Sequence, residues 1–203
     1  MFNIQSRFAD TSKFKPSTTK EKVIVFASRM HFQKRPDWFI KAISILKKEN
    51  FTELTNWKFH FLGDGDLSKE MEELIITKGL ENLVIRKYSG DLSSIYPTTS
   101  CYVSTQDFEN FPSLSMMEAM ACGNAIISRN VGQTSLMVKD EENGLLLKED
   151  SPKGLAKMLK KYITSSNEQR VGMQNESLRL VKEVHTPVSF IAQIEDFWVT
   201  LLN

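Results

Sequence analysis

A single carboxylate, Glu118, lies in an otherwise apolar segment, LSMMEAMAC, at residues 114–122. A helix that is apolar almost all round is expected to be buried. Burial of an unpaired carboxylate is costly, or it raises the pKa of the group until the group is neutral. We therefore expect Glu118 to satisfy a buried group of the protein, to pair with an arginine, or to accept hydrogen bonds from a ligand.

Basic residues gather after the first strand-like run of the chain. Arg29, Lys34 and Arg35 fall within seven residues, in the segment SRMHFQKRP. Arginine and lysine side chains, together with the free backbone N–H groups of a helix N-terminus, favour a phosphate or diphosphate. These cations are therefore candidates for binding such a group.

The predicted helix around Glu118 could hold two parts of a nucleotide. Glu118 lies about a turn and a half inside the helix predicted for residues 112–122, so the N-terminus near Ser113 and Leu114 is about 8 Å away. A carboxylate accepts hydrogen bonds from paired hydroxyls, such as the vicinal diol of a ribose. The same helix could therefore bind the diol through Glu118 and a diphosphate through its N-terminal N–H groups.

Each of these features also has a plainer explanation. Arg29 and Lys34, taken singly, are typical of a solvated loop, and the glycine turn GDG at residues 63–65 is often only a turn. Neither the dinucleotide fingerprint G-x-G-x-x-G nor the lysine motif of a P-loop occurs in the chain. The residues alone leave the type of ligand open.

Strand-like and helical segments alternate along the chain. Strand-like runs occur at residues 22–28, 57–63, 82–88, 100–106, 124–128 and 143–149. Helical patterns occur at residues 36–48, 67–79, 112–122, 151–164, 167–184 and 186–203. Nearly continuous apolar strands linked by helices predict an α/β, Rossmann-like fold, with a doubly wound parallel sheet of about six strands and helices on both faces. Ligands of such sheets bind beyond the carboxyl ends of the strands, which is where the basic segment, the glycine turn and the Glu118 helix are predicted to meet.

Composition restricts the class of protein. The 203 residues suffice for one α/β domain, and 26 basic against 25 acidic residues give a net charge of +1. This balance argues against nucleic acid as a partner, and we interpret the lysine-rich segment 153–162 as a solvated helix face. Cys101, Cys122 and the three histidines lack metal-ligand spacing, so no metal is predicted. The lack of an apolar signal core favours a cytoplasmic protein with at most peripheral contact with the inner face of the cell membrane.

Three segments together resemble a known family. They are VIVFASRMHFQKRPDWFIKAISIL, WKFHFLGDGDLSKEMEELI and ENFPSLSMMEAMACGNAIISRNVGQTSLMVKDEENGLLL. They are similar to the retaining, nucleotide-sugar-dependent glycosyltransferases of the GT-B fold, family 4, also called group 1. The resemblance covers most of the chain and is confined to the second, donor-binding domain of that fold.

The resemblance implies roles for particular residues. Arg29 and Lys34 have the family's spacing and are implied to contact the donor diphosphate, while Glu118 is implied to bind the ribose hydroxyls as the second of two family glutamates. Glu109 is the best match to the first glutamate, which contacts the donor sugar and has a catalytic or positioning role. Further donor-binding residues implied in this way are Gly63, Phe111, Pro112, Ser113 and Leu114.

Two departures from the family's pattern bear on these roles. Eight residues separate Glu109 from Glu118 where the family usually has seven, so Asn110 is an alternative for the first glutamate position. After the tripeptide NVG the family commonly has a glycine and a glutamate, whereas Leu136 takes the usual glutamate position here.

The resemblance also implies a domain division and a reaction. Residues 1–20 are expected to be the remnant of an inter-domain linker, residues 21–185 a nucleotide-sugar-binding domain, and residues 186–203 a helix that packs toward an N-terminal domain absent from this chain. The implied function is the donor-binding half of a hexosyltransferase that moves a sugar to an acceptor hydroxyl with retention, in bacterial surface polysaccharide or glycolipid synthesis. This fragment alone is expected to be inactive.

The implied substrate is a UDP- or GDP-sugar, and no tightly bound cofactor is expected. The acceptor is expected to be a glycan or a lipid-linked sugar that the missing domain binds. Two alternatives are a nucleotide-sugar epimerase of the GT-B fold and a nucleotide-binding domain without catalytic activity. The EAMACG helix argues against the epimerase, whereas the shifted glutamate spacing keeps the non-catalytic domain open.

Overall fold

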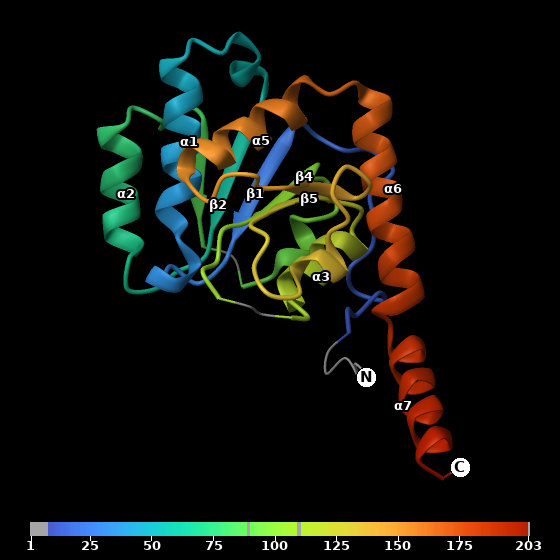
Figure 1. The fold of residues 1–203 in the computed structure, drawn as a ribbon. Helices are drawn as coiled ribbons and strands as arrows, with labels where there is room; N and C mark the ends of the chain where they lie inside the picture. Colours follow the sequence, from blue (N-terminus) through green and yellow to red (C-terminus); the bar gives the residue numbers. More distant parts are fainter. Residues whose placement is uncertain (1–7, 89, 109–110, 203) are drawn as a thin grey trace.

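A six-stranded parallel sheet forms the centre of the protein (Figure 1). The computed structural model describes residues 8–88, 90–108 and 111–202. The strands are β1 (Val23–Ala27), β2 (Lys58–Leu62), β3 (Val84–Lys87), β4 (Cys101–Ser104), β5 (Ala125–Ser128) and β6 (Gly144–Leu146). Their order is β3-β2-β1-β4-β5-β6, and every neighbouring pair is parallel. This is the order of a doubly wound sheet whose winding reverses between β1 and β4, which confirms the predicted fold class.

Helices cover both faces of this sheet. They are α1 (Pro36–Lys48), α2 (Ser68–Thr77), α3 (Leu114–Ala121), α4 (Thr134–Met137), α5 (Pro152–Thr164), α6 (Asn167–Val184) and α7 (Pro187–Leu202). Short 3-10 helices are η1 (Phe32–Lys34), η2 (Thr52–Asn56) and η3 (Leu92–Ser94). Helices α1, α2 and α5 lie on one face, and α3 and α6 lie on the other (Figure 1).

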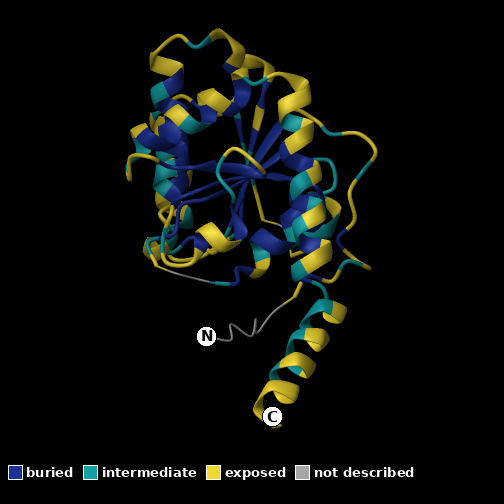
Figure 2. Ribbon diagram, turned by 45° about the vertical axis from the view of Figure 1, so that its right-hand side comes forward, coloured by how far each residue is buried: buried dark blue, intermediate teal, exposed yellow. Residues whose placement is uncertain are grey.

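Side chains alternate between two hydrophobic cores along the central strands β1, β4 and β5. In β1, Ile24 and Phe26 enter the core beneath α1 and α5, whereas Val25 and Ala27 enter the core beneath α3. Phe26 stacks on Phe39 of α1 with ring centroids 5.7 Å apart. Burial of each large apolar side chain stabilises the fold by about 1.5–3 kcal/mol, and Figure 2 shows the strands as the most buried part of the molecule.

Local sequence signals begin the helices. Ser151 accepts a hydrogen bond from the backbone N–H of Gly154 at 3.0 Å and caps α5, whose first residue is Pro152. Ser166 and Gln169 form a reciprocal capping box at the start of α6. Such caps satisfy the N–H groups that a helix cannot pair internally.

The six predicted strands and the predicted long helices are confirmed, with small shifts at their ends. Helix α3 begins at Leu114 rather than at residue 112, because Ser113 has extended backbone angles at the N-cap position. Strand β4 ends at Ser104, and the next residues leave the sheet. The short helix α4 was not predicted, because four residues carry too little periodicity to be recognised. None of the helices in the described part of the chain combines the length and the apolar composition that a membrane span requires.

The first described residues of the chain pack on the α3 side of the sheet. The N–H of Ala9 donates to the carbonyl oxygen of His185 at 2.9 Å, and Phe14 is buried against the ring of Tyr96. Helix α7 projects beyond the body of the protein, and none of its residues is buried (Figure 1).

Candidate functional site

A cavity of about 780 Å³ opens at the carboxyl ends of the central strands. It lies where the loops after β1 and β2 meet the first turns of α3. Five residues singled out from the sequence line it, and they come from three distant segments: Arg29, Lys34, Gly63, Leu114 and Glu118. The doubly wound order brings these segments together, because β2 and β4 both neighbour β1 in the sheet.

Three further predicted residues, Phe111, Pro112 and Ser113, are described and do not line this cavity. Phe111 packs against the core beneath α3, and Pro112 is buried. Ser113 is also buried, and its side chain makes no capping hydrogen bond to α3. Glu109 and Asn110, predicted as alternatives for the first glutamate position, lie outside the described residues.

Glu118 is half-buried on α3 and lines the cavity. Within residues 8–88, 90–108 and 111–202, its carboxylate has no hydrogen bond and no ion pair. Burial raises the pKa of Glu118, and the positive charge of Lys13 opposes that rise. The arrangement therefore leaves a carboxylate that can accept hydrogen bonds from a molecule in the cavity.

Lys34 and Arg29 also line the cavity and bring positive charge to it. The Nζ of Lys34 donates to Oε1 of Gln106 at 2.8 Å, which is a neutral acceptor. Burial, followed by the neighbouring charge of Arg29, lowers the pKa of Lys34. In the described part of the chain neither cation pairs with a carboxylate. A bound anion would relieve the repulsion between them.

The glycine turn after β2 forms a wall of this site from backbone atoms. Gly63 has φ of +119°, and a Cβ there would lie 1.9 Å from the carbonyl oxygen of Ser28. Gly65 has φ of +150°, and its Cβ would lie 2.7 Å from the carbonyl oxygen of Met30. Only glycine allows the two loops to lie so close together.

Helix α3, which carries Glu118, is fixed at its C-terminal end. Lys20 Nζ donates to the carbonyl oxygen of Cys122 at 2.6 Å, and Asn124 Nδ2 donates to that of Ala119 at 3.0 Å. Burial lowers the pKa of Lys20 to about 8. A cation at the last carbonyls of a helix is favourable because the helix dipole is negative there.

Several other residues that line the cavity were not among the predicted site residues, Ser115 and Tyr88 among them. Ser115 lines it and shares a hydrogen bond of 2.9 Å with the hydroxyl of Tyr102, and Tyr88, after β3, lines it with 74% of its surface exposed. Both could have been found: Ser115 stands three residues before Glu118 on the same helix face, and Tyr88 follows a strand at the carboxyl edge. No group of three or more metal-ligating side chains occurs within the described ranges.

Comparison with known proteins supports the family resemblance seen in the sequence. A family model described as "Glycosyl transferases group 1" matches residues 8–178. Among curated proteins, the chain is 26% identical over 195 residues to the "GalNAc-alpha-(1->4)-GalNAc-alpha-(1->3)-diNAcBac-PP-undecaprenol alpha-1,4-N-acetyl-D-galactosaminyltransferase" of Campylobacter jejuni. The match covers 96% of this chain and 52% of that relative, so the chain spans about half the length of this relative.

Two solved structures show the same fold. The S. aureus protein TarM, crystallised in a complex that includes UDP, has a TM-score of 0.77 at 23% identity, over 93% of this chain and 37% of TarM. The C-terminal domain of a glycosyl transferase group 1 family protein from Francisella tularensis has a TM-score of 0.74 at 24% identity, over 88% of this chain and 98% of that domain. The chain therefore has the Rossmann-like architecture of a GT-B glycosyltransferase domain and belongs to the glycosyl transferases group 1 family.

Proposed function

We propose that this chain binds the nucleoside diphosphate part of a sugar donor, in an enzyme that transfers the sugar to an acceptor hydroxyl with retention. The observation that carries this proposal is one cavity lined by two cations, by the first residue of α3 and by Glu118, whose carboxylate has no hydrogen bond in the described part of the chain. Family membership supports sugar transfer, and the UDP bound to TarM supports a nucleotide-sugar donor.

The cations are proposed to bind the diphosphate of the donor. Arg29 and Lys34 supply positive charge that the described carboxylates do not neutralise, and Leu114 presents the N-terminus of α3 to the same space. When the sugar departs, negative charge develops on the diphosphate, and preorganised cations and N–H groups stabilise it without reorganisation. This charge stabilisation is the main contribution that we assign to the chain in the reaction.

Glu118 is proposed to bind the ribose of the donor. Its carboxylate lies four residues beyond Leu114 on α3, which places it about one helical turn from the proposed diphosphate site. A ribose and a diphosphate are joined directly in a nucleoside diphosphate, so a separation of this size suits one molecule. The half-buried carboxylate gains partners from the 2′ and 3′ hydroxyls.

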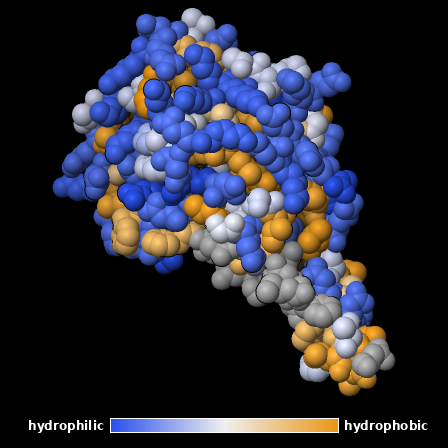
Figure 3. Space-filling view, in the orientation of Figure 1, coloured by the Kyte–Doolittle hydropathy of each residue, from blue (hydrophilic) through white to orange (hydrophobic). Residues whose placement is uncertain are grey.

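We also propose that α7 contacts a further domain and that the acceptor binds outside this chain. The family match ends at residue 178, and the exposed apolar residues of α7 include Ile191 and Trp198. Figure 3 shows hydrophobic surface, in orange, on the projecting part of the molecule. A lipid-linked glycan is the acceptor class suggested by the name of the Campylobacter relative.

Deletion of residues 186–203 should leave nucleotide binding unchanged, and a loss of binding would contradict this role for α7.

Calorimetric titration of the chain with UDP, GDP, ADP and dTDP tests the proposed function. We expect saturable binding of one of them, weakened about tenfold by Lys34→Ala because a charged hydrogen bond to the diphosphate is lost. Lys41→Ala is the matched control, since Lys41 on α1 pairs with Asp37 and does not line the cavity. A folded chain that binds none of the four diphosphates would contradict the proposal.

A further inference from the structure

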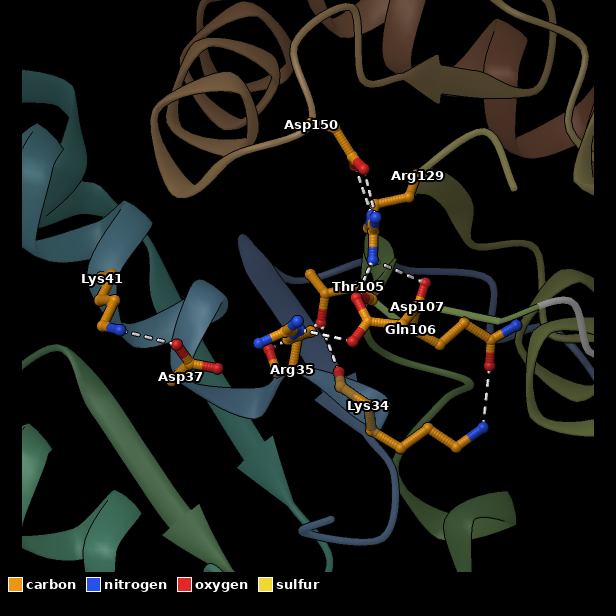
Figure 4. A network of polar contacts seen from close by, with 9 residues as sticks. All are labelled: Lys34, Arg35, Asp37, Lys41, Thr105, Gln106, Asp107, Arg129 and Asp150. Carbon is orange, nitrogen blue, oxygen red and sulfur yellow. Dashed lines mark hydrogen bonds and ion pairs between the residues drawn. The ribbon is translucent and has the colours of Figure 1, made fainter. Parts of the chain in front are cut away.

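The three residues that follow strand β4, residues 105–107, are hydrogen-bonded to the turn that carries Lys34. We call them the strand-end segment (Figure 4). The Thr105 hydroxyl lies 2.7 Å from the carbonyl oxygen of Lys34 and 2.9 Å from that of Arg35. The N–H of Asp107 donates to the carbonyl oxygen of Gln33 at 2.8 Å. Backbone atoms of three successive residues of the turn are thus bound to this segment.

Side chains make two further bonds between the same segments. The Nζ of Lys34 donates to Gln106 Oε1 at 2.8 Å, and the Nε of Arg35 donates to Asp107 Oδ2 at 2.6 Å. The 3-10 turn η1, which ends at Lys34, contains no buried residue. Its position in the molecule therefore depends on these bonds rather than on hydrophobic packing of its own.

Arg129, which follows β5, holds the strand-end segment from the other side. It is 8% exposed, and its guanidinium lies 4.8 Å from the centre of the Trp38 ring. It forms ion pairs with Asp107 and Asp150, and its Nη1 donates to the carbonyl oxygen of Gln106 at 3.2 Å. Asp107 therefore bridges two arginines, with one carboxylate oxygen on Arg35 and the other on Arg129 (Figure 4).

The backbone beside Lys34 is strained, and the same bonds hold it. Arg35 has φ of 45° and ψ of 51°, in the left-handed region that a residue with a Cβ adopts at a cost of about 1 kcal/mol or more. Its carbonyl oxygen accepts from Thr105, and its side chain pairs with Asp107. A non-glycine residue keeps this conformation only where contacts with the surrounding structure hold it there.

We propose that Asp107, supported by Arg129, is a positioning residue that holds the Lys34 ammonium at the donor cavity. This inference rests on the proposed function, because it assigns to Lys34 the diphosphate of the donor. Asp107 does not line the cavity and acts through the turn that it fixes. Its loss loosens the turn, so that the ammonium of Lys34 spends less time in the position that an anion needs.

The test compares Asp107→Asn with Asp37→Asn in the full chain. Both carboxylates are partly buried and pair with a cation, but the side chain of Asp37 pairs with Lys41 rather than with Arg35 or Arg129. We expect Asp107→Asn to weaken binding of the nucleoside diphosphate chosen from UDP, GDP, ADP and dTDP by about threefold to tenfold, and Asp37→Asn by less than about twofold. In a Lys34→Ala background, Asp107→Asn should have almost no further effect.

Hydrogen–deuterium exchange of the amides at residues 32–35 supplies a second readout that needs no ligand. Faster exchange in Asp107→Asn than in Asp37→Asn would support the positioning role. Equal exchange in both variants, or an effect of Asp107→Asn on affinity that persists in Lys34→Ala, would overturn it. If the wild-type chain binds none of the four diphosphates, the proposed function fails, while the exchange still decides whether Asp107 fixes the turn.

Discussion

Glu118 is a carboxylate that destabilises the unliganded fold. Burial raises its pKa, and the charge of Lys13 compensates only in part. A group whose pKa is higher in the folded than in the unfolded chain favours folding in its protonated form. That contribution is fully present below the pKa of the unfolded chain and is lost as the pH rises through the folded pKa. At neutral pH the ionised carboxylate therefore lowers stability, which is characteristic of a residue retained for binding.

We expect Glu118→Gln to stabilise the chain at pH 7 while it weakens nucleotide binding. The gain should be a few tenths of a kcal/mol up to about 1 kcal/mol in the free energy of unfolding, because glutamine carries no charge to bury. It should shrink toward zero below about pH 4, where the glutamate is protonated in both folded and unfolded chains. Denaturant unfolding at both pH values measures this difference.

Glu73→Gln on the exposed surface of α2 serves as the control for this measurement and should change stability little at either pH. A gain for Glu118→Gln that increases on acidification would show that its carboxylate is not a destabilising group in the fold.

The sequence was sufficient to predict the position of some residues of the site, but not of others. Arg29, Lys34 and Glu118 could be predicted to share a cavity, because each stands at a fixed distance from a strand end, and the ends of parallel strands meet at one edge. The Asp107–Arg129 ion pair could not be predicted. It joins residues that follow two neighbouring strands, β4 and β5, and no local pattern encodes which of their side chains meet.

At the scale of elements, the turn between β2 and α2 is the most constrained connection of the site. We expect Gly63→Ala to lower the free energy of unfolding by about 3 kcal/mol or more. The alanine would adopt a positive φ, and its methyl group would overlap the carbonyl oxygen of Ser28. Equilibrium unfolding in urea measures the loss, and the same distortion should weaken nucleotide binding.

Gly172→Ala provides the matched comparison for this prediction. Gly172 lies inside α6, and a Cβ there would have no neighbouring atom within 4 Å. Alanine should stabilise the helix by about 0.5–1 kcal/mol. A Gly63→Ala variant as stable as Gly172→Ala would show that the two loops can separate without loss.

Most of the helices and strands could be predicted, because the spacing of apolar residues along them is clear in the sequence. Strands that are buried on both faces appear as continuous apolar runs, and α5 shows both its proline and its serine cap in the sequence. The predicted start of α3, at residue 112, is two residues too early, because Pro112 is also typical of a first helical position. The 3-10 turn η1 has no periodic signal, so the element that carries Lys34 could not be recognised as one.

At the scale of the whole molecule, topology decides which residues meet. The order β3-β2-β1-β4-β5-β6 places β1 between β2 and β4, so the loop after β1 lies between those after β2 and β4. This is why residues 29, 63 and 118 line one cavity although they are far apart in the chain. The alternation of strands and helices was sufficient to predict the class of fold, and the family resemblance was needed to predict the ligand.

The most direct measurement of the central claim compares a nucleoside diphosphate with its 2′,3′-dideoxy counterpart, by calorimetry, on the wild-type chain and on Glu118→Gln. If Glu118 binds the ribose diol, the wild-type chain should bind the dideoxy compound about tenfold more weakly, because hydrogen bonds to a charged acceptor are lost. The difference between the two compounds should be smaller for Glu118→Gln, because its amide oxygen is a neutral and weaker acceptor. Equal affinity of the wild-type chain for both compounds would contradict the account, since Glu118 would then have no ribose to bind.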